Sequence, residues 1–148
     1  MYLILKWLHI LSAIIAVGAN ATYIAWLRLA DQEQEAKPFV FRGLDRLESM
    51  TLPFYILLFL SGLGMLFVSG LPWTTPWVLS GIVGFVLMAF LGARMFGPAL
   101  RQMRALADTP ESPEYQALEE RNSRILVIVL LLAVLVEYLM TAKPALWG

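Results

Sequence analysis

The chain has 148 residues, of which 59% are hydrophobic and 15% charged, and its mean hydropathy is +0.71. A water-soluble domain carries about 45–50% apolar and about 25% charged residues, and a chain this short cannot hide such an excess of apolar surface. Eleven basic and eleven acidic side chains give a net charge of zero, which argues against a nucleic-acid partner, since such a partner calls for a basic face or stripe. The absence of cysteine excludes disulfides, thiolate metal sites and cysteine nucleophiles. The composition therefore indicates an integral membrane protein surrounded by the lipid bilayer.

Four apolar runs are long enough to cross a hydrocarbon core, which takes about 20 residues of helix. The predicted transmembrane spans are residues 3–27, 52–71, 76–96 and 125–141. Backbone groups in lipid must find partners within the protein, and the runs lack the alternation of barrel strands, so helix is the only assignment. The predicted fold class is all-α: a polytopic membrane protein whose single domain, residues 1–148, is a four-transmembrane-helix bundle. No basic segment precedes the first run, so we predict a retained helix and not a signal peptide.

Basic residues are concentrated in two of the connections. Residues 28–51 and 97–124 hold eight of the eleven lysines and arginines, whereas the connection 70–75 has no charge. The positive-inside rule therefore predicts that both longer loops are cytoplasmic and that both termini lie outside the inner (plasma) membrane. An aromatic belt is expected near the outer boundary, formed by Trp73, Trp77, Tyr138 and Trp147.

The two predicted cytoplasmic loops contain helical signals. Residues 38–47 show apolar side chains at helical spacing, which predicts either a short helix on the membrane surface or an amphipathic lead-in to the second span. In the second loop, Ser112 followed by Pro113 is typical of an N-cap and a first helical residue. We therefore predict that the third and fourth helices extend into the cytoplasm as a hairpin, in which Arg101 and Arg104 can pair with acidic residues of the other arm.

Ionisable residues in a spanning helix cost roughly 2.5–3.5 kcal/mol at the bilayer centre and by default mark function. Three candidates are present, His9, Arg94 and Glu137, of which Arg94 lies near a helix end and can snorkel. Small and polar residues on one face of a membrane helix are typical of a bundle interior. Such faces are predicted on the first helix (His9, Ser12, Ala13, Ala16, Asn20, Tyr23), the second (Ser61, Gly62, Gly64, Met65) and the third (Trp77, Gly81, Gly84, Met88, Gly92, Met95).

His9 and Glu137 fall at comparable depths, on the order of 10 Å inside the outer helix ends, and Met65 falls near the same level. We therefore predict that His9 and Glu137 face each other. A carboxylate that accepts from one imidazole N–H would leave the other nitrogen for a ligand or a proton. In the alternative interpretations, His9 is a satisfied interior polar residue, or Lys6 pairs with Glu137 instead.

Several short motifs resemble those of known families. The opening Leu5-Lys6-Trp7-Leu8-His9-Ile10-Leu11-Ser12-Ala13 resembles the first helix of a family of predicted bacterial integral membrane proteins, domain-of-unknown-function family 2269. Ser61-Gly62-Leu63 and Ala142-Lys143-Pro144 are similar to that family too, so the resemblance covers essentially the whole chain and implies a membrane protein of unknown function. The opening is also similar to that of HemJ-type protoporphyrinogen oxidases and CopD-type copper-resistance proteins, whose histidines bind haem or copper. That resemblance extends only to His9, because the chain has no second histidine.

Three functions are compatible with these features. The favoured one is a structural or accessory protein that binds a second copy or another membrane protein through its glycine faces or cytoplasmic hairpin. The second is a b-type haem or porphyrin protein with His9 as metal ligand and Met65, Met88 or a second copy's His9 opposite. The third is a proton-linked transporter module that uses His9 and Glu137, although the repeats and broken helices typical of transporters are absent. No nucleophile–base constellation or phosphate loop indicates an enzyme.

Overall fold

The computed structural model describes residues 1–143 except for the side chains of Asp31 and Gln34, so Pro144 and Trp147 lie outside the described residues. The described elements are α1 (Tyr2–Gln32), η1 (Gln34–Ala36), α2 (Lys37–Ser69), α3 (Pro76–Leu91), η2 (Gly92–Phe96), α4 (Gly97–Ala105) and α5 (Pro113–Ala142). Because α3, η2 and α4 follow one another without a break, they count as one long helix. The described residues therefore form four helices long and apolar enough to cross a membrane. The predicted fold class is confirmed.

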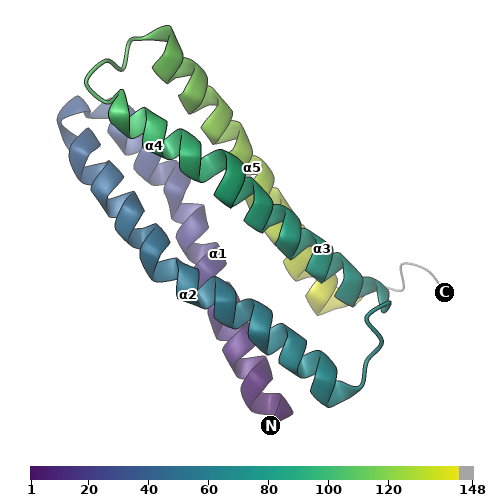
Figure 1. Cartoon of the computed structure of the whole chain (residues 1–148). Helices are drawn as coiled ribbons and strands as arrows, with labels where there is room; N and C mark the ends of the chain where they lie inside the picture. The colour runs from purple at the N-terminus through teal and green to yellow at the C-terminus, as the bar shows by residue number, and fades with distance from the viewer. Residues whose placement is uncertain (144–148) are drawn as a thin grey trace.

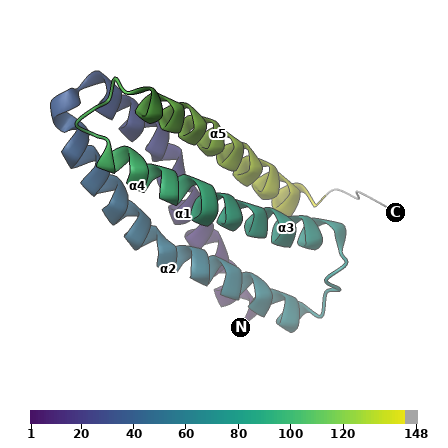
Figure 2. The ribbon, with the colours of Figure 1, turned by 45° about the horizontal axis from the view of Figure 1, so that its top comes forward.

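The helices form two antiparallel hairpins, α1 with α2 and α3–α4 with α5 (Figure 1). Residue 1, the connection 70–75 and the last turn of α5 lie at one end of the molecule, which we call the terminal end. The connections 33–36 and 106–112 lie at the opposite end, which we call the basic end because most arginines are near it (Figure 2).

Local signals in the sequence set the helix boundaries. The side chain of Ser112 accepts a hydrogen bond from the backbone N–H of Tyr115, so the predicted start of the last helix is confirmed. Gly70 ends α2 in a left-handed conformation, with φ of 66°, and its N–H donates to the carbonyl of Leu66. Residues 38–47 belong to α2 without interruption. The separate surface helix is therefore wrong, and the amphipathic lead-in is correct.

A single π-helical turn, η2, connects α3 to α4 shortly before Pro98. Proline has no N–H to donate to the carbonyl four residues earlier, and wider helical turns are common where the regular hydrogen-bond register is interrupted. The third helix nevertheless continues past the predicted span 76–96 to Ala105, as the predicted extension requires.

The apolar core lies at the basic end. Its buried members are Tyr23, Leu27, Ala30, Val40, Phe41, Leu44, Phe96, Ala99, Leu100, Met103, Tyr115, Leu118, Ile125, Leu126 and Val129. Charged side chains on the exposed faces of the same helices, such as Arg42, Arg46 and Arg104, indicate that water surrounds much of this region. Apolar burial is favourable where water would otherwise cover the surface, which is why the core forms at this end.

Close packing at the terminal end depends on glycines. A Cβ atom at Gly84 would come within 2.3 Å of Val136 Cγ2, and one at Gly64 within 3.3 Å of a Leu5 methyl carbon. In lipid no hydrophobic force drives helices together, so close backbone approach at small residues supplies the contact instead. The predicted packing of Gly81 and Gly84 against a neighbouring helix is confirmed, with α5 as that neighbour.

The two hairpins are less closely joined at the terminal end than at the basic end. Phe59 of α2 stacks on Phe85 of α3 at a centroid distance of 5.2 Å. Beyond this contact, the start of α1 and the end of α5 diverge in both views (Figures 1 and 2). The buried core therefore holds the hairpins together mainly at the basic end.

At the basic end, Arg104 pairs with a different helix from the predicted one. Arg104 of α4 pairs with Asp45 of α2, and Arg124 pairs with Glu120 one turn earlier on α5. The expected pairing of Arg104 with acidic residues of the other arm is thus replaced by a link between the two hairpins. Both pairs are exposed, and such pairs contribute only about 0–1 kcal/mol each.

Candidate functional site

His9 is held against α2. Its Nδ1 lies 2.9 Å from the carbonyl oxygen of Leu58 and 3.3 Å from Ser61 Oγ. A carbonyl oxygen can only accept, so Nδ1 carries a proton and donates it to Leu58. In the neutral imidazole the lone pair is therefore on Nε2, the arrangement usual for histidines that bind a metal or exchange a proton. The ring packs on the backbone of Gly62, where a Cβ would lie 3.0 Å from Cε1.

The contact between α1 and α2 continues as a polar seam. About two to three turns further along α1 toward the basic end, the amide nitrogen of Asn20 donates to the hydroxyl of Tyr55, which donates in turn to the carbonyl of Ala16 at 3.2 Å. Ser12, fully buried between these two sites, has a hydroxyl with no hydrogen-bond partner in the described chain. The predicted interior stripe of α1 thus faces α2, where His9 and Asn20 have hydrogen-bond partners and Ser12, within the described chain, has none.

Glu137 does not join this seam. Its side chain is exposed on α5, and no hydrogen bond or ion pair within residues 1–143 connects it to His9 or Lys6. The predicted pairing of His9 with Glu137 is therefore wrong. His9 lies between α1 and α2, whereas Glu137 belongs to the other hairpin.

The depth of Glu137 makes its exposure unusual. It lies six residues before Lys143, whose ammonium group sits 4.9 Å from the centre of the Trp77 ring. Tryptophan and lysine mark the boundary between membrane and water, so Glu137 lies about 9 Å inside that boundary. A charged side chain costs roughly 2.5–3.5 kcal/mol at the bilayer centre and less at this depth, unless a partner compensates it.

The two methionines proposed as ligands lie apart. Met65 is on α2, one turn beyond Ser61, and so belongs to the helix that already contacts His9. Met88 packs against the core at the basic end. The structure thus does not bring Met88 or Glu137 to His9, and the described residues contain no group of three histidine, aspartate or glutamate side chains placed to hold a metal ion.

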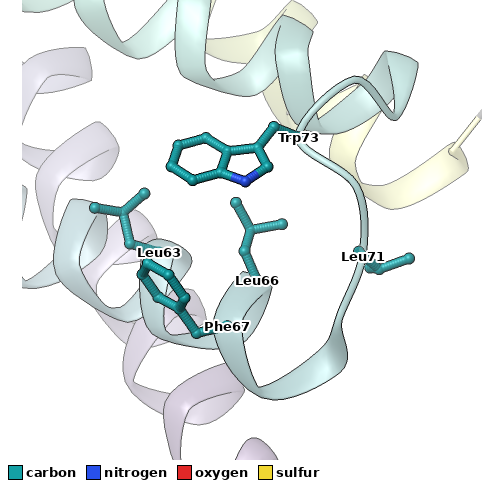
Figure 3. A pocket seen from close by; sticks show the side chains of 5 residues that line it. All are labelled: Leu63, Leu66, Phe67, Leu71 and Trp73. Atoms are coloured by element: carbon teal, nitrogen blue, oxygen red, sulfur yellow. The ribbon is translucent and has the colours of Figure 1, made fainter.

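A small pocket lies at the terminal end, between the last turns of α2 and the connection to α3. Figure 3 shows the Trp73 ring over side chains of α2, and the lining consists of Leu63, Leu66, Phe67, Leu71 and Trp73. Its volume of about 40 Å³ is room for only a few water molecules, each of which needs about 10–15 Å³. The pocket is too small for a porphyrin and serves to pack Trp73 of the expected aromatic belt against Phe67.

Two polar features were not predicted from the sequence. Tyr55 and the carbonyl of Leu58 complete the seam, and the spacing of three residues from Tyr55 to Leu58 and from Leu58 to Ser61 was the available signal. Lys37, assigned only as a loop charge, is buried with its ammonium group 4.6 Å from the centre of the Tyr115 ring. A cation held on an aromatic face has no local pattern in sequence, because the partner comes from another helix.

Four long apolar helices, a polar seam between two of them and an intramembrane carboxylate define a polytopic integral membrane protein. The model of one family, described as predicted integral membrane protein (DUF2269), matches residues 3–144. The chain belongs to that family, whose function is unknown. No curated protein and no solved structure matches it.

Proposed function

We propose that the chain is an accessory membrane protein whose terminal-end half binds another membrane-spanning chain. The observation that carries this proposal is Glu137, an exposed carboxylate about 9 Å inside the membrane boundary. Ionisable side chains at such depth almost always face a bundle interior, a water-filled cavity or a charged partner. A partner helix over this face would supply what the single chain does not.

Packing at the terminal end supports the same proposal, but it favours a different surface for the partner from the glycine faces expected from the sequence. The glycine faces, first considered for partner binding, are covered by the chain's own helices, with His9 on Gly62 and Val136 on Gly84. What is left uncovered is the divergent part of the two hairpins, including the exposed apolar faces of α1 and α5 (Figure 1). The partner surface is therefore proposed at these outer helix faces.

Photo-crosslinking in native membranes tests the proposal. A benzophenone amino acid in place of the exposed Tyr138, next to Glu137, should form an adduct with a polypeptide. Glu137→Gln in the same protein should lower the yield, because the neutral amide keeps the shape of the side chain and removes its charge. Adducts with lipid alone, or a yield that Glu137→Gln does not change, would contradict an accessory role through this face.

A second candidate function, haem or metal binding through His9, is favoured by one observation. The hydrogen bond from Nδ1 to Leu58 leaves Nε2 free to bind a metal. The fit is incomplete, because Met88 and Glu137 lie elsewhere and α2 packs directly on the ring at Gly62. His9 would hold the metal alone among the described residues around it, so a second ligand would have to come from Met65 after rearrangement or from another copy.

The haem hypothesis has a direct spectroscopic test. Protein purified from haem-replete cells should show a Soret band that His9→Ala abolishes, while Glu137→Gln should leave it unchanged because Glu137 does not contact His9. A colourless preparation that takes up no added hemin would eliminate this candidate. The proton-linked transporter hypothesis relied on His9 and Glu137 acting together, and no observation favours it once they lie apart.

A further inference from the structure

Two opposite charges are exposed at the terminal end, Lys6 on α1 and Glu137 on α5. Neither belongs to the two ion pairs found within the described residues. The charges that do form pairs, such as Arg104 with Asp45, lie at the basic end, where water can also solvate them. Lys6 and Glu137 therefore lie within predicted spans without an ion pair in the described chain, as does Arg94, which is near the opposite end of its span and can snorkel.

Lys6 and Glu137 lie at similar depths. Lys6 is four residues from the start of α1 at Tyr2, about 6 Å along the helix, and Glu137 is five residues from the end of α5 at Ala142, about 7.5 Å. The flexible lysine side chain can move its ammonium group along the helix by more than this difference. Two copies in one membrane have the same orientation, so groups at equal depth on different copies can meet.

The face of α5 that carries Glu137 has the character of an interior face. Glu137 follows Ala133 by four residues and Leu126 by eleven, so the three side chains lie on one side of the helix. Ala133 and Leu126 are buried, whereas Glu137 is exposed because α1 diverges from α5 at the terminal end (Figures 1 and 2). The same divergence keeps Lys6 of the same chain away from Glu137.

We propose that a second copy of this chain covers this face, with Lys6 of each copy beside Glu137 of the other. The inference rests on the proposed function and names the partner. One chain presents both members of the pair, so its surface is self-complementary, as a two-fold dimer requires. A two-fold axis along the membrane normal forms two equivalent Lys6–Glu137 pairs, which neutralise all four charges. A different protein would have to supply its own charges at the same depth.

Cysteine crosslinking tests the contact, and the chain contains no cysteine that would interfere. Two differently tagged copies, one carrying Lys6→Cys and the other Glu137→Cys, are co-expressed and oxidised in native membranes. A disulfide-linked product that carries both tags is expected. In the control, Leu135→Cys replaces Glu137→Cys: Leu135 is exposed, lies at nearly the same depth and faces the other side of α5, so its yield should be much lower.

Charge reversal then tests whether the ion pair holds the dimer. Lys6→Glu alone and Glu137→Lys alone should each weaken association of tagged copies in lipid nanodiscs, on the order of tenfold. The double variant Lys6→Glu with Glu137→Lys should recover most of that loss, and this recovery also shows that the variants fold. Equal association of all four proteins, or no recovery in the double variant, would overturn the proposal.

The remaining outcomes separate this inference from the proposed function. If the benzophenone at Tyr138 joins the chain to a different polypeptide and no product carries both tags, the accessory role stands and the dimer is wrong. If Lys6→Cys and Glu137→Cys placed in one chain link only within that chain, the hairpins close on each other and the dimer is wrong. If the benzophenone finds only lipid, both proposals fail.

Discussion

The imidazole of His9 depends on two features of α2, the carbonyl of Leu58 that accepts from Nδ1 and the missing side chain at Gly62. The carbonyl fixes the tautomer, and the glycine lets the ring approach the helix. Neither feature is visible at the histidine itself. A sequence pattern shows that His9 belongs to an interior face, but not which helix covers that face.

The closeness of His9 to Gly62 gives a prediction at the scale of one residue. Gly62→Ala places a Cβ 3.0 Å from Cε1 and 3.3 Å from Nδ1, so the ring must move and the hydrogen bond to Leu58 weakens. We expect the free energy of unfolding to fall by about 1–3 kcal/mol, measured by thermal unfolding in detergent. Gly18→Ala is the matched control, because nothing lies within 4 Å of that position. Equal stability of the two variants would contradict the role of Gly62.

At the scale of helices, the two hairpins differ in the chemistry that holds each one together. Hydrogen bonds between side chains and carbonyls cross the contact between α1 and α2, as with Tyr55 and Ala16. The contact between α3 and α5 uses glycines that admit Val136 and Met140. Both are ways to associate helices where lipid removes the hydrophobic driving force.

The contact between α3 and α5 predicts a selective loss of stability. Gly84→Leu adds a branched side chain where even a Cβ would lie 2.3 Å from Val136 Cγ2, so the helices must separate. We expect the free energy of unfolding in detergent to fall by at least the amount caused by overpacking a core, about 1–3 kcal/mol, measured by thermal unfolding. Leu79→Ile, at an exposed position of the same helix, should change little. If Gly84→Leu is tolerated as well as Leu79→Ile, the close approach is not needed for stability.

Sequence reasoning predicted the helices better than their contacts. Apolar length defined the membrane spans, and Ser112 with Pro113 located the start of α5, because these signals are local. The pairing of His9 required knowing how α1 is rotated and which hairpin it belongs to. Counting residues from the helix ends put Glu137 at the expected level of His9. Depth does not distinguish a neighbour on α2 from a residue on α5.

For the whole molecule, the position of the core predicts where truncations matter. Leu44→Ala at the basic end removes a fully buried side chain and should cost about 2–5 kcal/mol. Leu131 of α5 is 64% exposed and is predicted to contact lipid, so Leu131→Ala should cost far less. Unfolding by denaturant in detergent measures both. A larger loss for Leu131→Ala would show that stability does not come mainly from the core at the basic end.

Orientation of the whole molecule is predicted by the arginines. With the basic end in the cytoplasm, alkaline phosphatase fused after Gly148 should be active, because that enzyme requires the oxidising side of the membrane. A green fluorescent protein inserted between Thr109 and Pro110 should fluoresce. If only a reporter that works in the cytoplasm were active at the C-terminus, the predicted topology would be wrong.

The location of the core has a consequence for biosynthesis. Val40, Phe41 and Leu44 emerge early from the ribosome, but the α5 residues that cover them, among them Tyr115 and Ile125, are made last. Until then this part of the core lacks its α5 members, even though the first hairpin already has its own seam of hydrogen bonds. A chain interrupted before α5 should therefore insert with an unfinished core, and we expect α5 to decide how long the protein survives proteolysis, measured as its half-life in membranes.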